Sequence, residues 1–213
     1  MFLKKTMSFF RSVDSYLNVD SYRFARFVYL KFIDYLNVLY RFIDRFRIRN
    51  KFRVDAPEAK LHLGCGEQHK EGFINIDWRK TLATDYVCDI TSLPFRDNTI
   101  SLIETYHVIE HLSQKEALLA MKKWFEILKE GGVLIIECPN FDEAVGEYLD
   151  GNSNRIFNIF GYHRFPGDAH QFGYNYDRLR SALIDIGFKT IIETDPTDYH
   201  ILEEPCMRVE AVK

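Results

Sequence analysis

The sequence has no long apolar run. Charged residues interrupt every stretch before the roughly 18 apolar residues that identify a membrane-spanning helix, so no span is predicted. Lys4 and Lys5 stand near the start, but neither an apolar segment nor a small-residue cleavage site follows them, and a secretory signal is not expected. We therefore expect a cytoplasmic protein.

Cysteine is also scarce, and its spacing does not indicate metal binding. The four cysteines are far apart, form no CxxC pair and have no histidine partner at zinc-ligand spacing. Each lies in or beside a predicted strand, where a free thiol behaves as a small buried hydrophobe. This pattern favours a reducing compartment, and no metal site is expected from these residues: Cys65, Cys88, Cys138 and Cys206.

Charge is distributed unevenly along the 213 residues. The net charge is −3, yet residues 1–53 carry +8 and the remainder carries −11. Ala56 and Pro57 read as a linker between these regions. The length allows one sizeable α/β domain with an appendage. We predict a basic, aromatic helical extension over 1–55 and a globular domain over 56–213.

The extension reads as a helix with a narrow polar stripe. From Ser21 to Phe46, polar positions recur mostly at spacings of three and four, and nearly everything between them is apolar. So much apolar surface must be covered. Residues 1–53 could pack on the globular domain or form a homodimer contact, or lie on the inner face of a membrane, where Lys and Arg meet anionic headgroups. The pattern is too apolar for a nucleic-acid arm, so no nucleic acid is expected.

The second region alternates short apolar runs with helical segments, which predicts an α/β fold with a mostly parallel sheet flanked by helices. The expected strands are residues 60–63, 72–76, 86–88, 100–105, 132–138, 188–193 and 208–212, about seven in all. The expected helices are residues 113–129 and 177–186, the second ending at a glycine.

A glycine turn follows the first predicted strand, in Leu63-Gly64-Cys65-Gly66. Glycine allows the backbone to turn sharply and to approach a ligand closely. Such a turn is weak evidence alone, but two acids follow at the ends of later strands. Asp77, before Trp78, could accept ribose hydroxyls; Asp89 could meet an adenine amino group while Ile90 packs on the ring. Each acid could instead be a turn or cap residue.

These residues lie in longer matching stretches: LHLGCG, GFINIDW, CDITSLPF, HVIEHL and ILKEGGVLIIECPN. The sequence resembles class I, Rossmann-like methyltransferases of the methyltransferase type 11 group, which are often associated with bacterial polysaccharide and lipopolysaccharide pathways. The resemblance implies S-adenosylmethionine as cofactor. It also implies that the glycine turn passes under the methionine part, Asp77 holds the ribose, and Asp89 and Ile90 face adenine. The cofactor-binding residues expected are Leu63, Gly64, Cys65, Gly66, Asp77, Trp78, Asp89, Ile90 and His107.

Two features depart from the general pattern. Ten residues separate Gly66 from Asp77, whereas the dinucleotide fingerprint places its acid about 20 residues on. The helix after the glycine turn must therefore be reduced to a turn. In addition, His62 stands where many methyltransferases have an acid, which leaves the contact with the cofactor's amino group unassigned.

Methyl transfer requires alignment of the acceptor and, for a hydroxyl, removal of its proton. The catalytic candidates are His107, after the fourth strand, and His163 and His170, in a Gly- and aromatic-rich segment that reads as a lid. By resemblance, His107 could instead shape the cofactor site. His107, Glu110 and His111 could in principle bind a metal, but the reaction does not require one and none is expected.

The predicted function is methylation of a small-molecule acceptor, on a hydroxyl of a sugar or of a glycan- or lipid-linked intermediate. Two alternatives stay open: a non-catalytic module that binds S-adenosylmethionine or a partner, and methylation of a lipid- or quinone-type acceptor. A nicotinamide-dependent enzyme is disfavoured by the missing third glycine and the absence of a Tyr-x-x-x-Lys pair.

Overall fold

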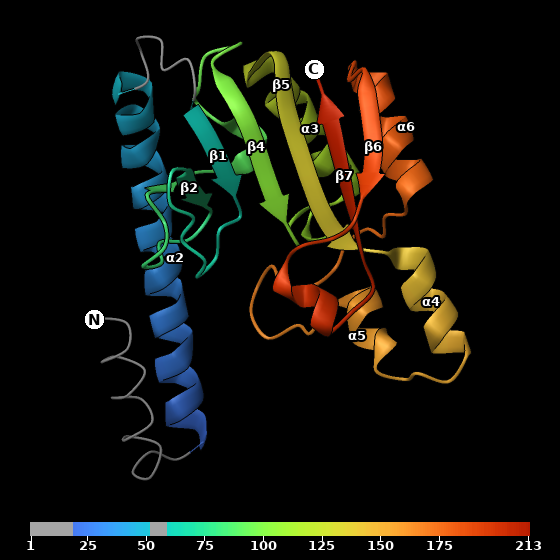
Figure 1. Cartoon of the computed structure of the whole chain (residues 1–213). Helices are drawn as coiled ribbons and strands as arrows, with labels where there is room; N and C mark the ends of the chain where they lie inside the picture. Colours follow the sequence, from blue (N-terminus) through green and yellow to red (C-terminus); the bar gives the residue numbers. More distant parts are fainter. Residues whose placement is uncertain (1–18, 52–58) are drawn as a thin grey trace. The chain divides into compact units, whose positions relative to one another are not determined.

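The computed structural model describes residues 19–51 and 59–213 (Figure 1). The chain divides into two compact units, residues 1–39 and 40–213. Helix α2 (Val19–Lys51) contributes to both, so the division falls inside this helix rather than near residue 55, where the sequence suggested a boundary. The predicted Ala56-Pro57 linker lies outside the described residues. None of the described helices is long and apolar enough to cross a membrane.

The second unit contains a single seven-stranded sheet in the described part of the chain, with strand order β3-β2-β1-β4-β5-β7-β6. All neighbouring pairs from β3 to β5 are parallel, and β7 is antiparallel to both β5 and β6. This confirms the predicted Rossmann-like, mostly parallel sheet. The strands are β1 (Ala59–Leu63), β2 (Ile74–Asp77), β3 (Tyr86–Val87), β4 (Ile100–Tyr106), β5 (Leu128–Pro139), β6 (Thr190–Thr194) and β7 (Cys206–Val212).

Strand β5 begins four residues earlier than the pattern predicted. Leu128 pairs with Ile100 and Val133 pairs with Leu102, so the residues between Leu128 and Val133 bulge out of the ladder. Gly132 is needed there, because a Cβ on it would lie 2.8 Å from the Lys129 carbonyl oxygen.

Two helices agree closely with their predicted ranges. Helix α3 (Gln114–Ile127) begins after Ser113, whose hydroxyl accepts from the Glu116 amide in a capping box. Its buried face includes Trp124, which donates its indole N–H to the Ile90 carbonyl at 3.0 Å. Helix α6 (Tyr176–Ile186) ends at Gly187, whose φ of +122° suits glycine.

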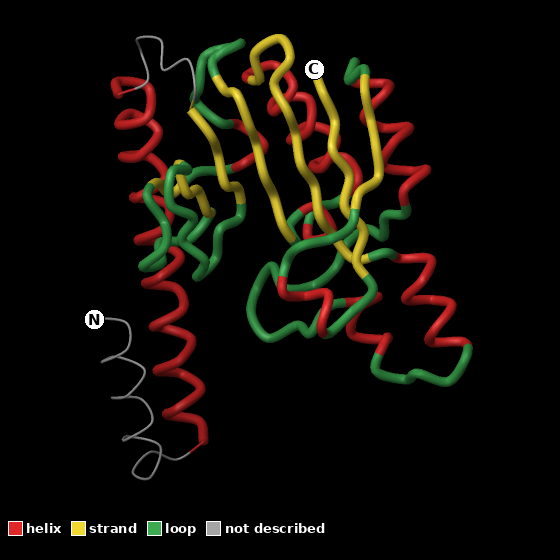
Figure 2. Tube along the Cα trace, in the orientation of Figure 1, coloured by secondary structure: helices red, strands yellow, loops and turns green. Residues whose placement is uncertain are grey.

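Two further helices follow β5 and were not predicted: α4 (Phe141–Leu149) and α5 (Arg155–Phe160). Three short 3-10 helices were also missed, at Ile90–Ser92, Ile109–His111 and Tyr199–Leu202. Figure 2 shows loops and short helices gathered where the parallel strands end. Ligands of open α/β sheets bind at this edge.

The C-terminal part of α2, residues 40–51, belongs to the second unit and packs on its edge strand β3. Ile48 is fully buried. The carboxylate of Asp44, also buried, accepts a hydrogen bond from the Val87 amide at 2.9 Å. Arg47 lies over the Tyr86 ring at 5.2 Å. This contact covers an otherwise open sheet edge.

Candidate functional site

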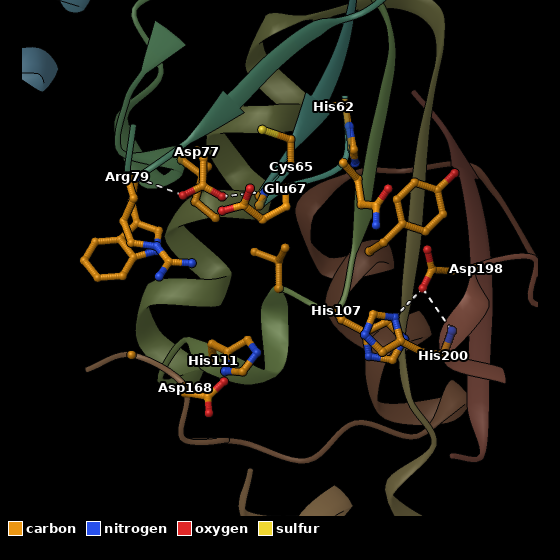
Figure 3. A pocket seen from close by; sticks show the side chains of 18 of the residues that line it. His62, Cys65, Glu67, Asp77, Arg79, His107, His111, Asp168, Asp198 and His200 are labelled. Atoms are coloured by element: carbon orange, nitrogen blue, oxygen red, sulfur yellow. Dashed lines mark hydrogen bonds and ion pairs between the residues drawn. The ribbon is translucent and has the colours of Figure 1, made fainter. Parts of the chain in front are cut away.

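A cavity of about 880 Å³ opens at the carboxyl ends of the parallel strands (Figure 3). Its wall comes from the segments after β1, β2, β3 and β4, together with two loops that are distant in sequence, residues 164–168 and 197–200. A cavity of this size accommodates a nucleoside cofactor together with a small acceptor.

The glycine turn forms one wall of this cavity. Gly64 has φ of +69° and donates its N–H to the Ile76 carbonyl at 2.8 Å. A Cβ on Gly64 would lie 2.2 Å from Cγ2 of Val108, so no other residue fits without movement of the chain. Gly66 also has positive φ, +52°, and nothing lies within 4 Å of its Cβ position. Residues 64–73 contain turns and no helix, as the short spacing to Asp77 required.

Asp77 ends β2, is buried and lines the cavity. One carboxylate oxygen accepts from the Gly66 N–H and the other from the Arg79 N–H, each at 2.8 Å. The side chain therefore holds the glycine turn in place, which is the structural role that the sequence left open for it. Each carboxylate oxygen has a second lone pair, so Asp77 can still accept from a ligand hydroxyl.

Asp89 and Ile90 also line the cavity. Oδ1 of Asp89 caps the following 3-10 helix by accepting from the Thr91 N–H at 2.9 Å and from the Thr91 hydroxyl at 2.7 Å. Asp89 is exposed, and its Oδ2 accepts no hydrogen bond from the described residues. Capping and ligand binding are thus compatible at Asp89.

Of three further residues predicted to contact the cofactor, two line the cavity and one does not. Trp78 and Cys65 line the cavity. Burial and the nearby Asp77 raise the pKa of the Cys65 thiol to about 12, so this side chain is an uncharged part of the cavity wall. Leu63 does not line the cavity: its side chain is fully buried in the core, because alternate residues of a strand point to opposite faces. The prediction for the Leu63 side chain was wrong.

His107 lines the cavity but is held by acidic neighbours. Its Nδ1 lies 3.3 Å from Glu204 and 3.5 Å from Glu110, and its Nε2 lies 3.6 Å from Cys206 Sγ. Burial opposes a charge on the ring, but the contacts with Cys206, Glu110 and Glu204 outweigh it and raise the pKa of His107 to about 12. An imidazole that is already protonated cannot accept a proton from the acceptor, so His107 shapes the site rather than acting as its base.

The two histidines of the predicted lid do not line the cavity. His163 is exposed and its Nε2 lies 2.9 Å from the Phe160 carbonyl. His170 is half-buried and faces His111, with ring centroids 4.9 Å apart. Neither of these two catalytic candidates therefore faces the cavity, because the segment turns its other side chains toward it. Those side chains are Arg164, Phe165 and Asp168.

A polar group that no sequence pattern indicated lies on the opposite wall, at the start of the 3-10 helix Tyr199–Leu202. Asp198 and His200 line the cavity, and Nδ1 of His200 is paired with the Asp198 carboxylate (Figure 3). The His200 ring stacks on His107, with centroids 3.9 Å apart. These residues lie between β6 and β7 in the sequence, and no motif marks them.

A second missed group lies beside β1. Lys70 is ion-paired with Glu104 on β4, and the Tyr106 hydroxyl donates to Glu104 at 2.9 Å. Next to them, His62 is buried, and burial lowers its pKa, so it is neutral and contacts Asn75 at 3.1 Å. A neutral imidazole thus replaces the acid expected before the glycine turn. Lys70, His62 and Tyr106 all line the cavity.

Comparison with known proteins agrees with this geometry. Residues 58–136 match the family model described as a methyltransferase domain. A solved S-adenosylmethionine-dependent methyltransferase of Thermotoga maritima, described as a possible histamine N-methyltransferase, has a TM-score of 0.52 at 15% identity over 89% of this chain and 98% of that one. One from Archaeoglobus fulgidus has a TM-score of 0.51 at 13% identity, over 81% and 94%. The fold is that of S-adenosylmethionine-dependent methyltransferases.

A curated relative is similar as well. An uncharacterized protein of Methanocaldococcus jannaschii is 28% identical over 148 residues, which are 61% of this chain and 61% of that protein. The chain thus spans about three fifths of that relative's length. The domain match covers the glycine turn, Asp77 and Asp89, and agrees with the predicted enzyme class and cofactor.

Proposed function

We propose that the chain is an S-adenosylmethionine-dependent methyltransferase. The observation that carries this proposal is the Gly64–Gly66 turn, which Asp77 holds in place and which lines the cavity, with nothing within 4 Å of the Cβ position of Gly66. Gly64 and Gly66 would lie against the methionine part, Asp77 would hold the ribose hydroxyls, and Asp89 and Ile90 would face the adenine. When bound, the cofactor supplies an electrophilic methyl group on a sulfonium.

For the acceptor, we propose a hydroxyl of a sugar or sugar-bearing intermediate. The cavity wall combines polar side chains of residues 197–200 with Arg164, and Phe165 and Trp78 add aromatic faces. Polar groups can fix the orientation of a hydroxylated ring, whereas a lipid or quinone acceptor would favour an apolar tunnel. A wall of mixed polar and aromatic residues therefore supports the sugar.

His200 is the base that this arrangement supports. Asp198 pairs with Nδ1 and so holds the ring in one orientation, leaving Nε2 to accept a proton. Nε2 of His200 would accept the proton that leaves the acceptor hydroxyl as that oxygen takes up the methyl group, which the bound cofactor would supply. His107, as a neighbouring cation, is already protonated and takes no part in this transfer.

Calorimetry with S-adenosylmethionine and S-adenosylhomocysteine tests the cofactor. We expect binding by the intact chain, and at least tenfold weaker binding by Asp77→Ala, because the glycine turn loses its anchor and the ribose its acceptor. Asp185→Ala, at an exposed acid of α6 away from the cavity, is the matched control. An intact chain that binds neither compound would refute the proposal.

Turnover tests the reaction separately. With sugar and glycan acceptors offered, we expect production of S-adenosylhomocysteine, and His200→Gln to lower kcat by about 10²–10⁴ while cofactor binding stays unchanged. Binding without consumption of the cofactor, for every acceptor class offered, would favour the non-catalytic module instead. Turnover with lipid or quinone acceptors, and with no sugar acceptor, would show that the acceptor is a lipid or a quinone and not a sugar.

A further inference from the structure

A buried carboxylate beside the cavity has no hydrogen-bond partner. Glu110 lies in the 3-10 helix Ile109–His111 and is 3% exposed. Among the described residues, neither of its side-chain oxygens accepts a hydrogen bond. The nearest imidazole nitrogens are Nδ1 of His107 and Nε2 of His111, at 3.5 and 3.9 Å. Buried carboxylates are normally paired, hydrogen-bonded or bound to a metal.

Two histidines next to Glu110, His111 and His170, each have one ring nitrogen free to bind a metal ion. Nδ1 of His111 lies 3.2 Å from the Ala169 carbonyl, and Nδ1 of His170 lies 2.8 Å from the Asn158 carbonyl. A carbonyl only accepts, so each Nδ1 carries the proton and each Nε2 keeps a lone pair. This is the arrangement of metal-bound histidines, whose second nitrogen donates to a fixed acceptor.

The three side chains converge. One ligand atom each of Glu110, His111 and His170 lies within 4.8 Å of the others. Backbone contacts hold the two segments together: the Gln171 N–H donates to the Glu110 carbonyl at 2.7 Å, and the Gln171 side chain donates to the His111 carbonyl at 2.8 Å. These hydrogen bonds fix the segment of His170 against the segment of Glu110 and His111, so the three side chains are held close together.

We propose that Glu110, His111 and His170 bind a divalent transition-metal ion, of the class of Zn²⁺ or Fe²⁺. Two imidazoles and one carboxylate suit these ions better than Mg²⁺ or Ca²⁺, which prefer oxygen ligands. Ligands at about 2.0–2.2 Å from one ion lie roughly 3–4 Å apart, and His111 Nε2 is 3.9 Å from Glu110. Three protein ligands leave a position open, and His111 places it beside the cavity.

This proposal departs from the sequence-based expectation of no metal. The sequence suggested only His107, Glu110 and His111 as a set, and the fold adds His170 from a segment about 60 residues away. It is independent of the proposed function, since ion binding needs neither cofactor nor acceptor.

Two other clusters in the described residues offer three ligands, but they are satisfied internally. His107, Glu204 and Cys206 form one, and His107, Asp198 and His200 the other. Nδ1 of His107 contacts Glu204 and its Nε2 contacts Cys206, while His200 is paired with Asp198. Of the three clusters, only that of Glu110 contains a buried carboxylate that accepts no hydrogen bond from the described residues.

Titration of the full, tag-free chain with Co²⁺, followed by Zn²⁺ competition, tests the site. We expect one Co²⁺ per chain with visible d–d absorption and no thiolate-to-cobalt charge-transfer band. Glu110→Gln and His170→Gln should each weaken binding by about 10–100-fold, as loss of a ligand or of its support does. His163→Asn, which alters an exposed histidine with φ of +54° that asparagine tolerates, should bind as the parent chain does.

Folding is checked by thermal melting and circular dichroism of each variant. Zn²⁺ should raise the melting temperature of the parent chain and of His163→Asn, but not of His170→Gln. The proposal is overturned if the parent chain binds no Co²⁺ or Zn²⁺, or if folded Glu110→Gln and His170→Gln bind as tightly as the parent. It is equally overturned if binding survives in His170→Gln and is lost in Cys206→Ser, which would place the ion on the other cluster.

Discussion

At the residue scale, the site depends on one contact between the glycine turn and β2. The Asp77 carboxylate accepts from both Gly66 and Arg79, so it fixes the turn before any ligand arrives. Preorganisation of this kind lowers the entropy that binding must offset. The same residue thus serves as the turn's anchor and as the proposed ribose acceptor, and the two interpretations of Asp77 that the sequence left open do not exclude each other.

Gly64→Ala should be far more disruptive than Gly72→Ala. Both glycines have positive φ, which costs an alanine about 1–2 kcal/mol. Only at Gly64 would the new Cβ also lie 2.2 Å from Val108, whereas nothing lies within 4 Å at Gly72. Chemical denaturation and calorimetry should show a larger loss of stability and loss of cofactor binding for Gly64→Ala alone. Adding Val108→Ala should restore part of both; equal losses at the two glycines would contradict this account.

Cys65 and Cys88 should resist alkylation in the folded chain. Burial raises the pKa of Cys65 from 9.0 to about 12 and that of Cys88 to about 11, and only the thiolate reacts. Iodoacetamide at pH 8, read by peptide mass spectrometry, should label Cys65 about a thousandfold more slowly in the native than in the unfolded chain.

The same shifts make the free energy of unfolding fall with pH. Above pH 9 the unfolded thiols ionise, while the folded ones stay protonated up to their raised pKa values of about 12 and about 11. The contribution of Cys65 to stability is therefore complete below pH 9 and is lost between pH 9 and 12. Cys65→Ala should remove this part of the pH dependence, and an unchanged profile would count against it.

At the element scale, α2 has two parts with different surroundings. Residues 40–51 pack on β3, as Ile48 and Asp44 show. In the part that belongs to the first unit, several large apolar side chains are exposed, among them Phe24 at 69% and Phe27 at 57%. We propose that this part contacts an anionic membrane surface, because residues 1–39 carry six Lys and Arg against three Asp, a net charge of +3.

Co-sedimentation with liposomes tests the proposed contact. The intact chain should sediment with phosphatidylglycerol vesicles and not with phosphatidylcholine vesicles, and added salt should weaken binding. Phe24→Ala/Phe27→Ala should reduce it several-fold, whereas Leu82→Ala/Leu149→Ala, which removes equally exposed apolar side chains elsewhere, should not. If both double variants bind as the parent chain does, the membrane proposal fails and the dimer contact becomes the alternative to test by sedimentation.

At the scale of the whole molecule, the second unit extends into α2 beyond the expected domain boundary. Residues 40–213 form one compact unit, and Ile48 is part of its core cluster. A chain cut at residue 54 therefore exposes the edge strand β3 and leaves the Val87 amide without its Asp44 acceptor.

We expect residues 40–213 to fold and bind cofactor, and residues 54–213 to be less stable by roughly 3–5 kcal/mol, from a lost buried isoleucine and a lost buried hydrogen bond. Urea denaturation of the two truncated chains measures this difference. In the intact chain, Ile48→Ala should be clearly destabilising, whereas Ile43→Ala, at a position 44% exposed, should change little. Equal stability of the two truncated chains would show that the α2 contact is dispensable.

The sequence by itself determined the approximate positions of the strands along the chain, the glycine turn and the acids at the ends of β2 and β3. These are local properties: apolar periodicity, the conformations open to glycine, and a spacing to Asp77 too short for a helix. It also determined α3 and α6, whose ends carry a capping box and a terminal glycine.

Only the tertiary structure decided what stands across the cavity from the glycine turn. His200, Arg164 and Asp168 come from loops far along the chain, and no local pattern records which of their side chains face inward. Likewise, the protonation state of His107 depends on Glu110 and on Glu204, and Glu204 lies nearly one hundred residues further along the chain. Charges act through space, so a histidine that local sequence marks as a base becomes a cation when folding surrounds it with carboxylates.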